Sequence, residues 1–166
     1  MHPVLPFPVV GIDPGTHRSA YMILEKGKIS KFGKIPNKDL LQSPVLQTPD
    51  ALFGMEIFQS YGMAVGKEVF ETAYWIGRFF EQMKTDKLWP VYRTEVKLHT
   101  CGTVRAKDST VRESMIKRWG PPGKPREPGP TFGITEDVWS ALAIATTVFD
   151  WSKKQKPLPA HPAFAK

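Results

Sequence analysis

The distribution of proline limits most strongly what this chain can fold into. Eleven of its 16 prolines lie in three short segments, residues 1–8, 120–130 and 157–162. Because proline has no amide hydrogen and its ring obstructs a helix or an inner strand, we expect arms and loops in these segments. Regular structure is left to the remaining residues, which predicts one domain over residues 9–151 with an exposed, semi-rigid proline-rich loop inside it.

Net charge and cysteine content narrow the class of protein. The 166-residue chain has a formal net charge of +7, which favours an anionic partner such as nucleic acid or an acidic membrane surface. The single cysteine, Cys101, excludes an internal disulfide, and with four scattered histidines it argues against a zinc site. The chain shows no run of 18 apolar residues and no secretory leader, so we expect a cytoplasmic protein without membrane association.

Both ends of the chain are expected to lie outside the domain. Residues 1–8 indicate an extended N-terminal arm, and residues 152–166 a basic, proline-containing tail. The tail holds four lysines and no acid, namely Lys153, Lys154, Lys156 and Lys166. This charge suits either a solvated end that aids solubility or electrostatic contact with a partner, and the sequence leaves both open.

The order of apolar patterns predicts an α/β fold. Apolar runs predict strands at residues 9–12, 20–24, 28–35, 52–58 and 91–98. Helical spacing predicts helices at residues 37–41, 65–83, 109–119 and 136–151. Asn37 is expected to cap the first helix, and Glu25-Lys26-Gly27 to form a hairpin turn. An opening hairpin followed by alternating strands and helices is typical of the α/β class.

Three acidic residues beside apolar segments are candidates for a metal site. Asp13 ends the first strand before a Pro/Gly turn, Glu56 interrupts an apolar run, and Asp137 precedes the apolar residues 141–145. Each has an ordinary alternative: a turn cap, a solvent-facing residue of an edge strand, and a first-turn acid that suits the helix dipole. Carboxylates suit magnesium, and two such ions about 3.5–4 Å apart can activate water for phosphodiester hydrolysis and stabilise the leaving oxygen.

Four motifs in this order resemble those of the RuvC-type Holliday-junction resolvases, in particular their divergent bacteriophage branch. They are Gly11-Ile12-Asp13-Pro14-Gly15, Met55-Glu56, Ala106-Lys107-Asp108, and Asp137 followed by Ala141-Leu142-Ala143-Ile144-Ala145. The resemblance covers residues 9–150. It implies a ribonuclease-H-like fold, a five-stranded mixed sheet flanked by helices on both faces. It also implies a homodimer that nicks two strands of a four-way DNA junction symmetrically, using magnesium or manganese.

The same resemblance implies roles for individual residues. Asp13 matches the catalytic aspartate of the first strand, Glu56 the glutamate of the central strand, and Asp137 the first acid of an Asp-x-x-Asp pattern. Ser140 stands at the second acidic position, where a hydroxyl is a weaker magnesium ligand than a carboxylate. The implied metal ligands are therefore Asp13, Glu56, Asp137 and Ser140. Lys107 matches a lysine that acts on a phosphate or on developing negative charge, in catalysis and in DNA binding.

Further residues are expected to contact DNA. Phe58 and Tyr61 follow Glu56, where the family often carries an aromatic that stacks on an unpaired base; core packing is the alternative. The aromatic stretch 74–80 on the long predicted helix is expected near a dimer interface or packed on the sheet. Backbone phosphates are expected to be contacted by Lys97, Arg105, Lys107 and Lys117.

Two other functions stay open beside the magnesium-dependent resolution of four-way and other branched DNA junctions. A YqgF-type RNA nuclease with a related fold also opens on Asp-x-Gly with a nearby arginine, which His17-Arg18 partly resembles. The longer chain, the Ala-Lys-Asp motif and the basic tail favour the resolvase. The second alternative, indicated by Ser140, is a branched-DNA-binding module with weak or no cleavage.

Overall fold

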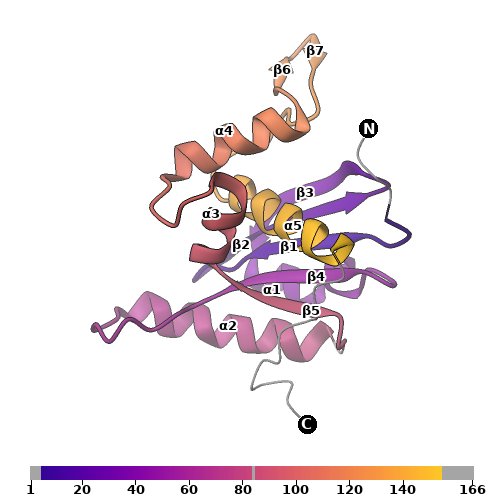
Figure 1. Cartoon of the computed structure of the whole chain (residues 1–166). Helices are drawn as coiled ribbons and strands as arrows, with labels where there is room; N and C mark the ends of the chain where they lie inside the picture. Colours follow the sequence, from indigo (N-terminus) through magenta and orange to yellow (C-terminus); the bar gives the residue numbers. More distant parts are fainter. Residues whose placement is uncertain (1–4, 84, 155–166) are drawn as a thin grey trace.

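A five-stranded mixed sheet in the order β3-β2-β1-β4-β5 forms the centre of the fold (Figure 1). The computed structural model describes residues 5–83 and 85–154. β1 pairs antiparallel with β2 and parallel with β4, and β4 pairs parallel with β5. The strands are β1 (Val9–Asp13), β2 (Arg18–Glu25), β3 (Lys28–Pro36), β4 (Leu52–Ile57) and β5 (Leu88–Tyr92).

Helices cover both faces of this sheet, which confirms the predicted ribonuclease-H-like fold class (Figure 1). On one face lie α1 (Asn37–Gln42), the 3₁₀ helix η1 (Pro44–Gln47) and α2 (Lys67–Met83). On the other lie α3 (Arg93–Cys101), α4 (Asp108–Trp119) and α5 (Val138–Lys153). A small hairpin of β6 (Gly123–Lys124) and β7 (Glu127–Pro128) projects beyond α4.

Alternation along the strands divides the apolar residues between two cores. Val9 belongs to the core that contains α3, α4 and α5, whereas its neighbour Val10 belongs to the core beneath α1 and α2. The same period of two recurs in β2, where Met22 and Ile23 point to opposite cores. A strand buried on both faces must read as a continuous apolar run, which explains the run at the start of the domain.

Close packing of α5 on β1 depends on glycine and alanine. A Cβ atom added to Gly11 would collide with the carbonyl oxygen of Ala141 and with Ala145. On the neighbouring strand, a Cβ at Gly54 would press on Val148 and Ile144. The helix therefore lies almost directly on the backbones of β1 and β4, and its first turn comes to the end of β1.

An ion-pair network fastens the far end of α5. Asp150 accepts hydrogen bonds from Arg118 Nη1 and Nη2 of α4 at 2.8 and 2.7 Å, and its Oδ2 lies 2.8 Å from His99 Nε2 of α3. Burial alone would raise the pKa of Asp150, but the bonds with His99 and Arg118 outweigh it and hold that pKa well below its usual range. The network therefore joins the three helices of this layer.

The predicted strand 91–98 is wrong in its position, because the strand lies at residues 88–92 and a helix follows it. β5 ends at Tyr92 and α3 begins at Arg93, because the side chain of Glu95 accepts a hydrogen bond from the Tyr92 amide at 2.8 Å and starts the helix. Pro90 lies inside β5, which is an edge strand, the position in a sheet where proline is tolerated.

The last helix and the first differ from prediction at their starts. α5 begins at Val138 rather than at residue 136, because Glu136 has a left-handed φ of +46°. Asn37 is the first residue of α1 and caps nothing; its side chain instead donates to the carbonyl of Gly15. Within the proline-rich loop the chain pairs as β6 and β7, closed by a bond from the Gly129 amide to the Pro122 carbonyl.

The two ends of the chain are described in part. Leu5 and Phe7 of the predicted arm pack against the core that contains α5, while residues 1–4 lie outside the described residues. α5 continues to Lys153, and residues 155–166 of the predicted tail lie outside the described residues. Across the described parts of the chain, every helix is too short or too polar to span a bilayer.

Gly11→Ala tests the close approach of α5 to β1. The added methyl group must push the helix away, so we expect the free energy of unfolding to fall by about 1–3 kcal/mol or more. Gly77→Ala is the matched control, because Gly77 lies in α2 with open space around its Cα, and it should raise the same quantity by about 1 kcal/mol. Urea unfolding measures both. A Gly11→Ala protein as stable as wild type would contradict the packing.

Candidate active site

The carboxyl ends of three strands bring the predicted site together. Because β1, β4 and β5 run parallel, their ends meet at one edge of the sheet. Asp13 is the last residue of β1, Glu56 lies one residue before the end of β4, and Arg93 follows β5 directly. Glu56 is thus on the strand beside the central one, β1, and not on the central strand itself.

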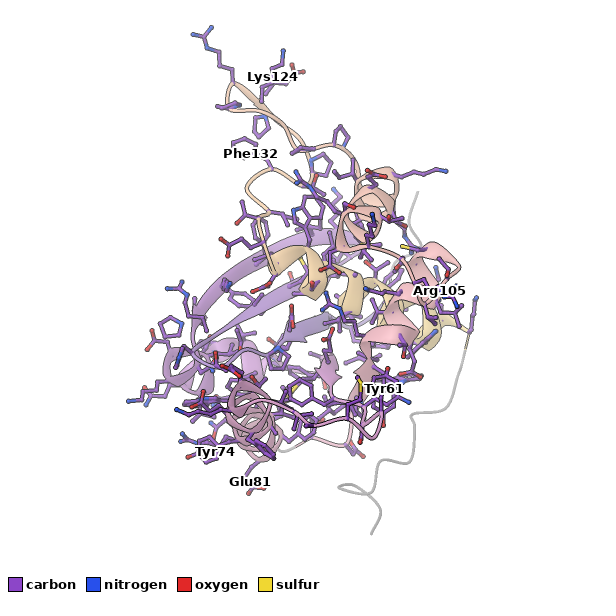
Figure 2. The ribbon with its side chains drawn as sticks, turned by 90° about the vertical axis from the view of Figure 1, so that its left-hand side faces the viewer. Tyr61, Tyr74, Glu81, Arg105, Lys124 and Phe132 are labelled. Carbon is purple, nitrogen blue, oxygen red and sulfur yellow. The ribbon has the colours of Figure 1, made fainter. Side chains whose placement is uncertain are left out.

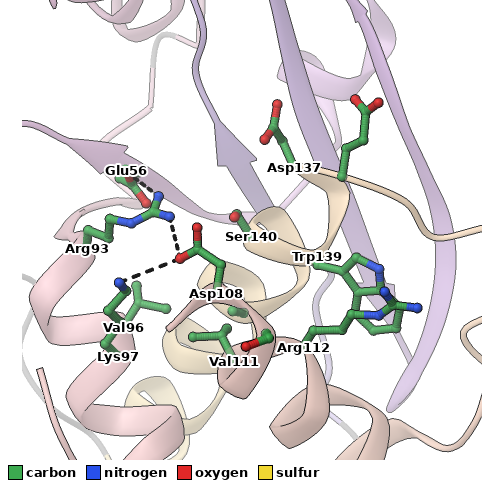
Figure 3. A pocket seen from close by; sticks show the side chains of 13 residues that line it. Glu56, Arg93, Val96, Lys97, Asp108, Val111, Arg112, Asp137, Trp139 and Ser140 are labelled. Atoms are coloured by element: carbon green, nitrogen blue, oxygen red, sulfur yellow. Dashed lines mark hydrogen bonds and ion pairs between the residues drawn. The ribbon is translucent and has the colours of Figure 1, made fainter. Parts of the chain in front are cut away.

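A pocket of about 380 Å³ opens beside this edge (Figure 3). Its walls come from β4 and from the first turns of α3, α4 and α5. The polar side chains that line it are Glu56, Arg93, Lys97, Asp108, Ser109, Arg112, Glu136, Asp137 and Ser140. Arg112 lies over the ring of Trp139 at 5.2 Å, which forms one side of the pocket.

Asp13 is the most strongly perturbed acid of the site. Burial raises its pKa well above the ordinary aspartate value, and the negative charges of Glu56 and Asp137 raise it further. Arg93 and a hydrogen bond with Ser140 act in the opposite direction without cancelling the effect. Glu56 and Asp137 are therefore both close enough to repel the Asp13 carboxylate, and Ser140 donates a hydrogen bond to Asp13.

Arg93 forms an ion pair with Glu56, the second of the three predicted carboxylates. Its Nη1 lies 3.6 Å from Glu56 Oε1, and its Nη2 donates to Asp108 Oδ1 at 2.7 Å. Burial raises the pKa of Glu56, and the nearby positive charge of Arg93 offsets this only in part. For Asp108, burial is outweighed by the bonds and charges of Arg93 and Lys97, so its pKa is lowered.

Lys34 of β3 forms an ion pair with Asp137, the third of the predicted carboxylates. Its Nζ lies 2.6 Å from Asp137 Oδ2 and 3.0 Å from Glu136 Oε2. The hydrogen bonds to these two carboxylates raise the pKa of Lys34. The side chain of Asp137 makes no cap bond to α5, so it does not serve as an ordinary helix cap and stays available at the pocket.

Two buried polar residues fix the turn that follows Asp13. Ser19 Oγ accepts from the Gly15 amide at 3.2 Å and donates to Asn37 Oδ1 at 2.6 Å. Asn37 Nδ2 donates to the Gly15 carbonyl at 2.8 Å, and its amide donates to the His17 carbonyl at 2.9 Å. This closed set of hydrogen bonds orients the end of β1 that carries the catalytic candidate.

The predicted DNA-binding residues lie in different places. Lys97 lines the pocket, with its Nζ 3.5 Å from Asp108 Oδ1. Lys107 precedes α4, is exposed and does not line the pocket, whereas its neighbour Asp108 does. Arg105 in the α3–α4 loop and Lys117 on α4 are exposed outside the pocket (Figure 2 labels Arg105).

Sequence reasoning assigned no role to Arg93 or Lys34. The predicted strand 91–98 placed Arg93 in mid-strand and concealed that it follows the strand end. Lys34 could have been found from the hairpin register, since it pairs with Ala20, which pairs with Asp13 on the next strand.

The donor set fits a divalent cation in charge and atom type. Asp13, Glu56 and Asp137 offer carboxylate oxygens and Ser140 a hydroxyl, which are hard ligands of the kind that magnesium prefers. Their mutual repulsion at Asp13 is the electrostatic condition that a bound cation relieves. Among residues 5–83 and 85–154, however, no three His, Cys, Asp or Glu side chains are already positioned to hold a metal ion.

The sheet order and the helices on its two faces define an α/β protein of the ribonuclease-H-like class. Its fold is similar to Thermus thermophilus RuvC, with a TM-score of 0.67 and 16% identity over 92% of this chain and 99% of that one. It is also similar to T. thermophilus RuvC in complex with a Holliday junction substrate, with a TM-score of 0.69, 15% identity and the same coverage of 92% and 99%. No family model and no curated protein sequence matches this chain. The chain therefore has a RuvC-like fold.

Asp13→Asn tests the electrostatic cost of the site. Because folding raises the Asp13 pKa, its ionised form destabilises the folded protein at neutral pH. Asparagine removes that charge, so in EDTA at pH 8 the variant should melt at least about 2–4 °C above wild type, the shift that about 1 kcal/mol gives in a chain of this size. The gain should shrink as the pH falls through the raised pKa and vanish below the ordinary aspartate range, where Asp13 is protonated in both states.

Thermal unfolding followed by circular dichroism between pH 3 and 8 measures this difference. Asp86→Asn, which neutralises an exposed acid, is the matched control and should leave the melting temperature almost unchanged. An Asp13→Asn protein that is less stable than wild type at pH 8, or a rise in melting temperature that does not depend on pH, would contradict the raised pKa of Asp13.

Proposed function

We propose that this protein is a structure-selective DNA endonuclease that resolves four-way junctions by metal-dependent phosphodiester hydrolysis. The observation that carries the proposal is the convergence of Asp13, Glu56 and Asp137 at one edge of a RuvC-like sheet, beside a pocket lined by cations. The similar fold of a RuvC solved with a Holliday junction substrate supports the choice of DNA. The bacteriophage branch, and with it the cytoplasm of a bacterial or phage-infected cell, is proposed on the sequence motifs alone.

Asp13, Glu56 and Asp137 would hold magnesium, with Ser140 as a weak ligand or a partner of metal-bound water; manganese should substitute. When bound, the metal would supply an activated water and positive charge at the leaving oxygen. Other side chains of the protein position these carboxylates. Arg93 orients Glu56, Lys34 orients Asp137, and Ser140 donates to Asp13.

DNA contacts are proposed around the pocket. Lys97 faces the pocket, and Arg105, Lys107 and Lys117 are exposed, so all four are available to phosphates. Lys107 remains the proposed catalytic lysine because it adjoins Asp108 at the pocket wall. Phe58 and Tyr61 are 45% and 62% exposed, too open for core residues, which supports their proposed stacking on bases (Figure 2 labels Tyr61).

A homodimer is proposed because two strands of a junction need two active sites. α2 and the segment before it expose large apolar side chains, namely Met63, Val65, Phe70 and Tyr74 (Figure 2 labels Tyr74). Arg78 lies 4.9 Å from the ring of Trp75 on the same helix. Exposed apolar patches of this kind mark interfaces, which supports α2 as the contact between two copies.

A binding module without cleavage is the second candidate. The observation that favours it is Ser140 in place of a second acid, together with the lack of three positioned metal ligands in the described part of the chain. The two candidates differ only in chemistry, so a cleavage assay separates them. The YqgF-type RNA nuclease is tested in the same assay with an RNA junction.

A synthetic four-way DNA junction with magnesium tests the proposal. Wild type should produce paired, symmetric nicks in opposed strands, and should leave linear duplex and an RNA junction intact. Asp13→Asn, Glu56→Gln and Asp137→Asn should each lower the single-turnover rate at least about 100-fold while binding persists, because each removes a metal ligand.

Ser140→Ala is the matched control on the same helix and should stay within about tenfold of wild type. Binding of the junction without nicking in either magnesium or manganese would establish the binding module instead. Normal cutting by Asp137→Asn would show that the site is wrongly assigned, with Glu136 as the residue to replace.

A further inference from the structure

A cluster of two cations and one acid forms the wall of the pocket between α3 and α4 (Figure 3). Arg93 Nη2 and Lys97 Nζ lie 2.7 and 3.5 Å from the same oxygen, Asp108 Oδ1. Through its other nitrogen, Arg93 also reaches Glu56 at 3.6 Å. The cluster is therefore continuous with the proposed catalytic carboxylates, yet Asp108 has no part in the mechanism proposed above.

Exposure differs sharply among the three side chains. Lys97 is only 19% exposed and Arg93 45%, whereas Asp108 is 72% exposed. The cations thus belong to the pocket wall, and the acid covers them from the solvent side. Because the Asp108 side chain is mostly open to water, its pairs with the two cations are weak, and a competing anion can displace its carboxylate at little cost.

The geometry suits one particular kind of anion. Arg93 Nη2 and Lys97 Nζ both approach Asp108 Oδ1, and a guanidinium nitrogen and an ammonium bind a phosphate oxygen as they bind a carboxylate oxygen. Asp108 is also the first residue of α4, a 12-residue helix whose N-terminus favours negative charge. A phosphodiester carries a single negative charge, as a carboxylate does, so one can replace the other on Arg93 and Lys97.

We propose that Arg93 and Lys97 form a phosphate-binding subsite beside the catalytic carboxylates, and that Asp108 occupies it in the free protein as an internal substitute for a DNA phosphate. The assignment of DNA as the ligand rests on the proposed function. Binding of DNA breaks the Asp108 pairs and leaves that acid close to the incoming phosphate. Asp108 thereby lowers the affinity of the active site for any phosphodiester.

Asp108→Asn tests this subsite. Fluorescence anisotropy in EDTA, with a labelled four-way junction and a linear duplex of the same arm sequence, measures affinity without cleavage or metal. The variant should bind the junction at least about fivefold more tightly than wild type. Glu81→Gln, the same charge change on an exposed position of α2, should stay within about twofold (Figure 2). No gain from Asp108→Asn, or an equal gain from Glu81→Gln, would overturn the proposal.

A combination of variants separates displacement from simple repulsion between Asp108 and DNA. In a protein with Arg93→Gln and Lys97→Gln, the subsite is gone, so adding Asp108→Asn should change affinity by less than about twofold. Simple repulsion would give the full gain in that background as well, and this result would overturn the proposal. Failure of the proposed function is distinct: it would appear as wild type showing no preference for the junction, whatever Asp108→Asn does.

Discussion

The contact between α5 and β1 is the constraint on which the candidate site depends. Gly11 has no Cβ, and Ala141 and Ala145 present the smallest side chains, so the helix lies on the backbone of the strand. The first turn of α5 then reaches the end of β1, where Ser140 donates a hydrogen bond to Asp13. A larger residue at any of these positions would move Asp137 and Ser140 away from the strand ends. The network around Asp150 holds the other end of the same helix and so fixes its direction.

This packing buries carboxylates whose negative charges destabilise the folded protein. Burial and like charge raise the pKa of Asp13, and burial raises that of Glu56, so both carboxylates destabilise the fold in their ionised forms. Two cations offset part of this repulsion. Arg93, which directly follows β5, pairs with Glu56, and Lys34 of β3 pairs with Asp137. Electrostatic destabilisation of this kind at a well-packed edge is typical of functional sites, where the groups needed for activity lower the stability of the fold. It is also the condition that favours a bound cation.

Most of the fold, and the acids of the site, could be predicted from the sequence. The strand runs, the hairpin at Glu25-Lys26-Gly27 and the long helices follow from periodicity, and Asp13 is placed at a strand end by the Pro/Gly turn after it. Arg93 and Lys34 were not predicted, because strand ends and strand pairing bring them to the site. Lys34 follows only from the register of the hairpin, and Arg93 only from the true end of β5. The error at residues 91–98 has a local origin: the bond from the Tyr92 amide to Glu95 ends the strand, and apolar content does not reveal it. The expected role of Asn37 as a cap gave way to a tertiary contact with Gly15.

Anomalous diffraction from crystals soaked in manganese would show directly whether Asp13, Glu56 and Asp137 together bind a divalent cation, as proposed here. Manganese scatters anomalously and takes the oxygen ligands that magnesium takes. We expect a peak within coordination distance of the Asp13 carboxylate and of Glu56 or Asp137, present in wild type and absent from Asp13→Asn. A map without a peak at this edge of the sheet, or with manganese bound only elsewhere, would contradict it.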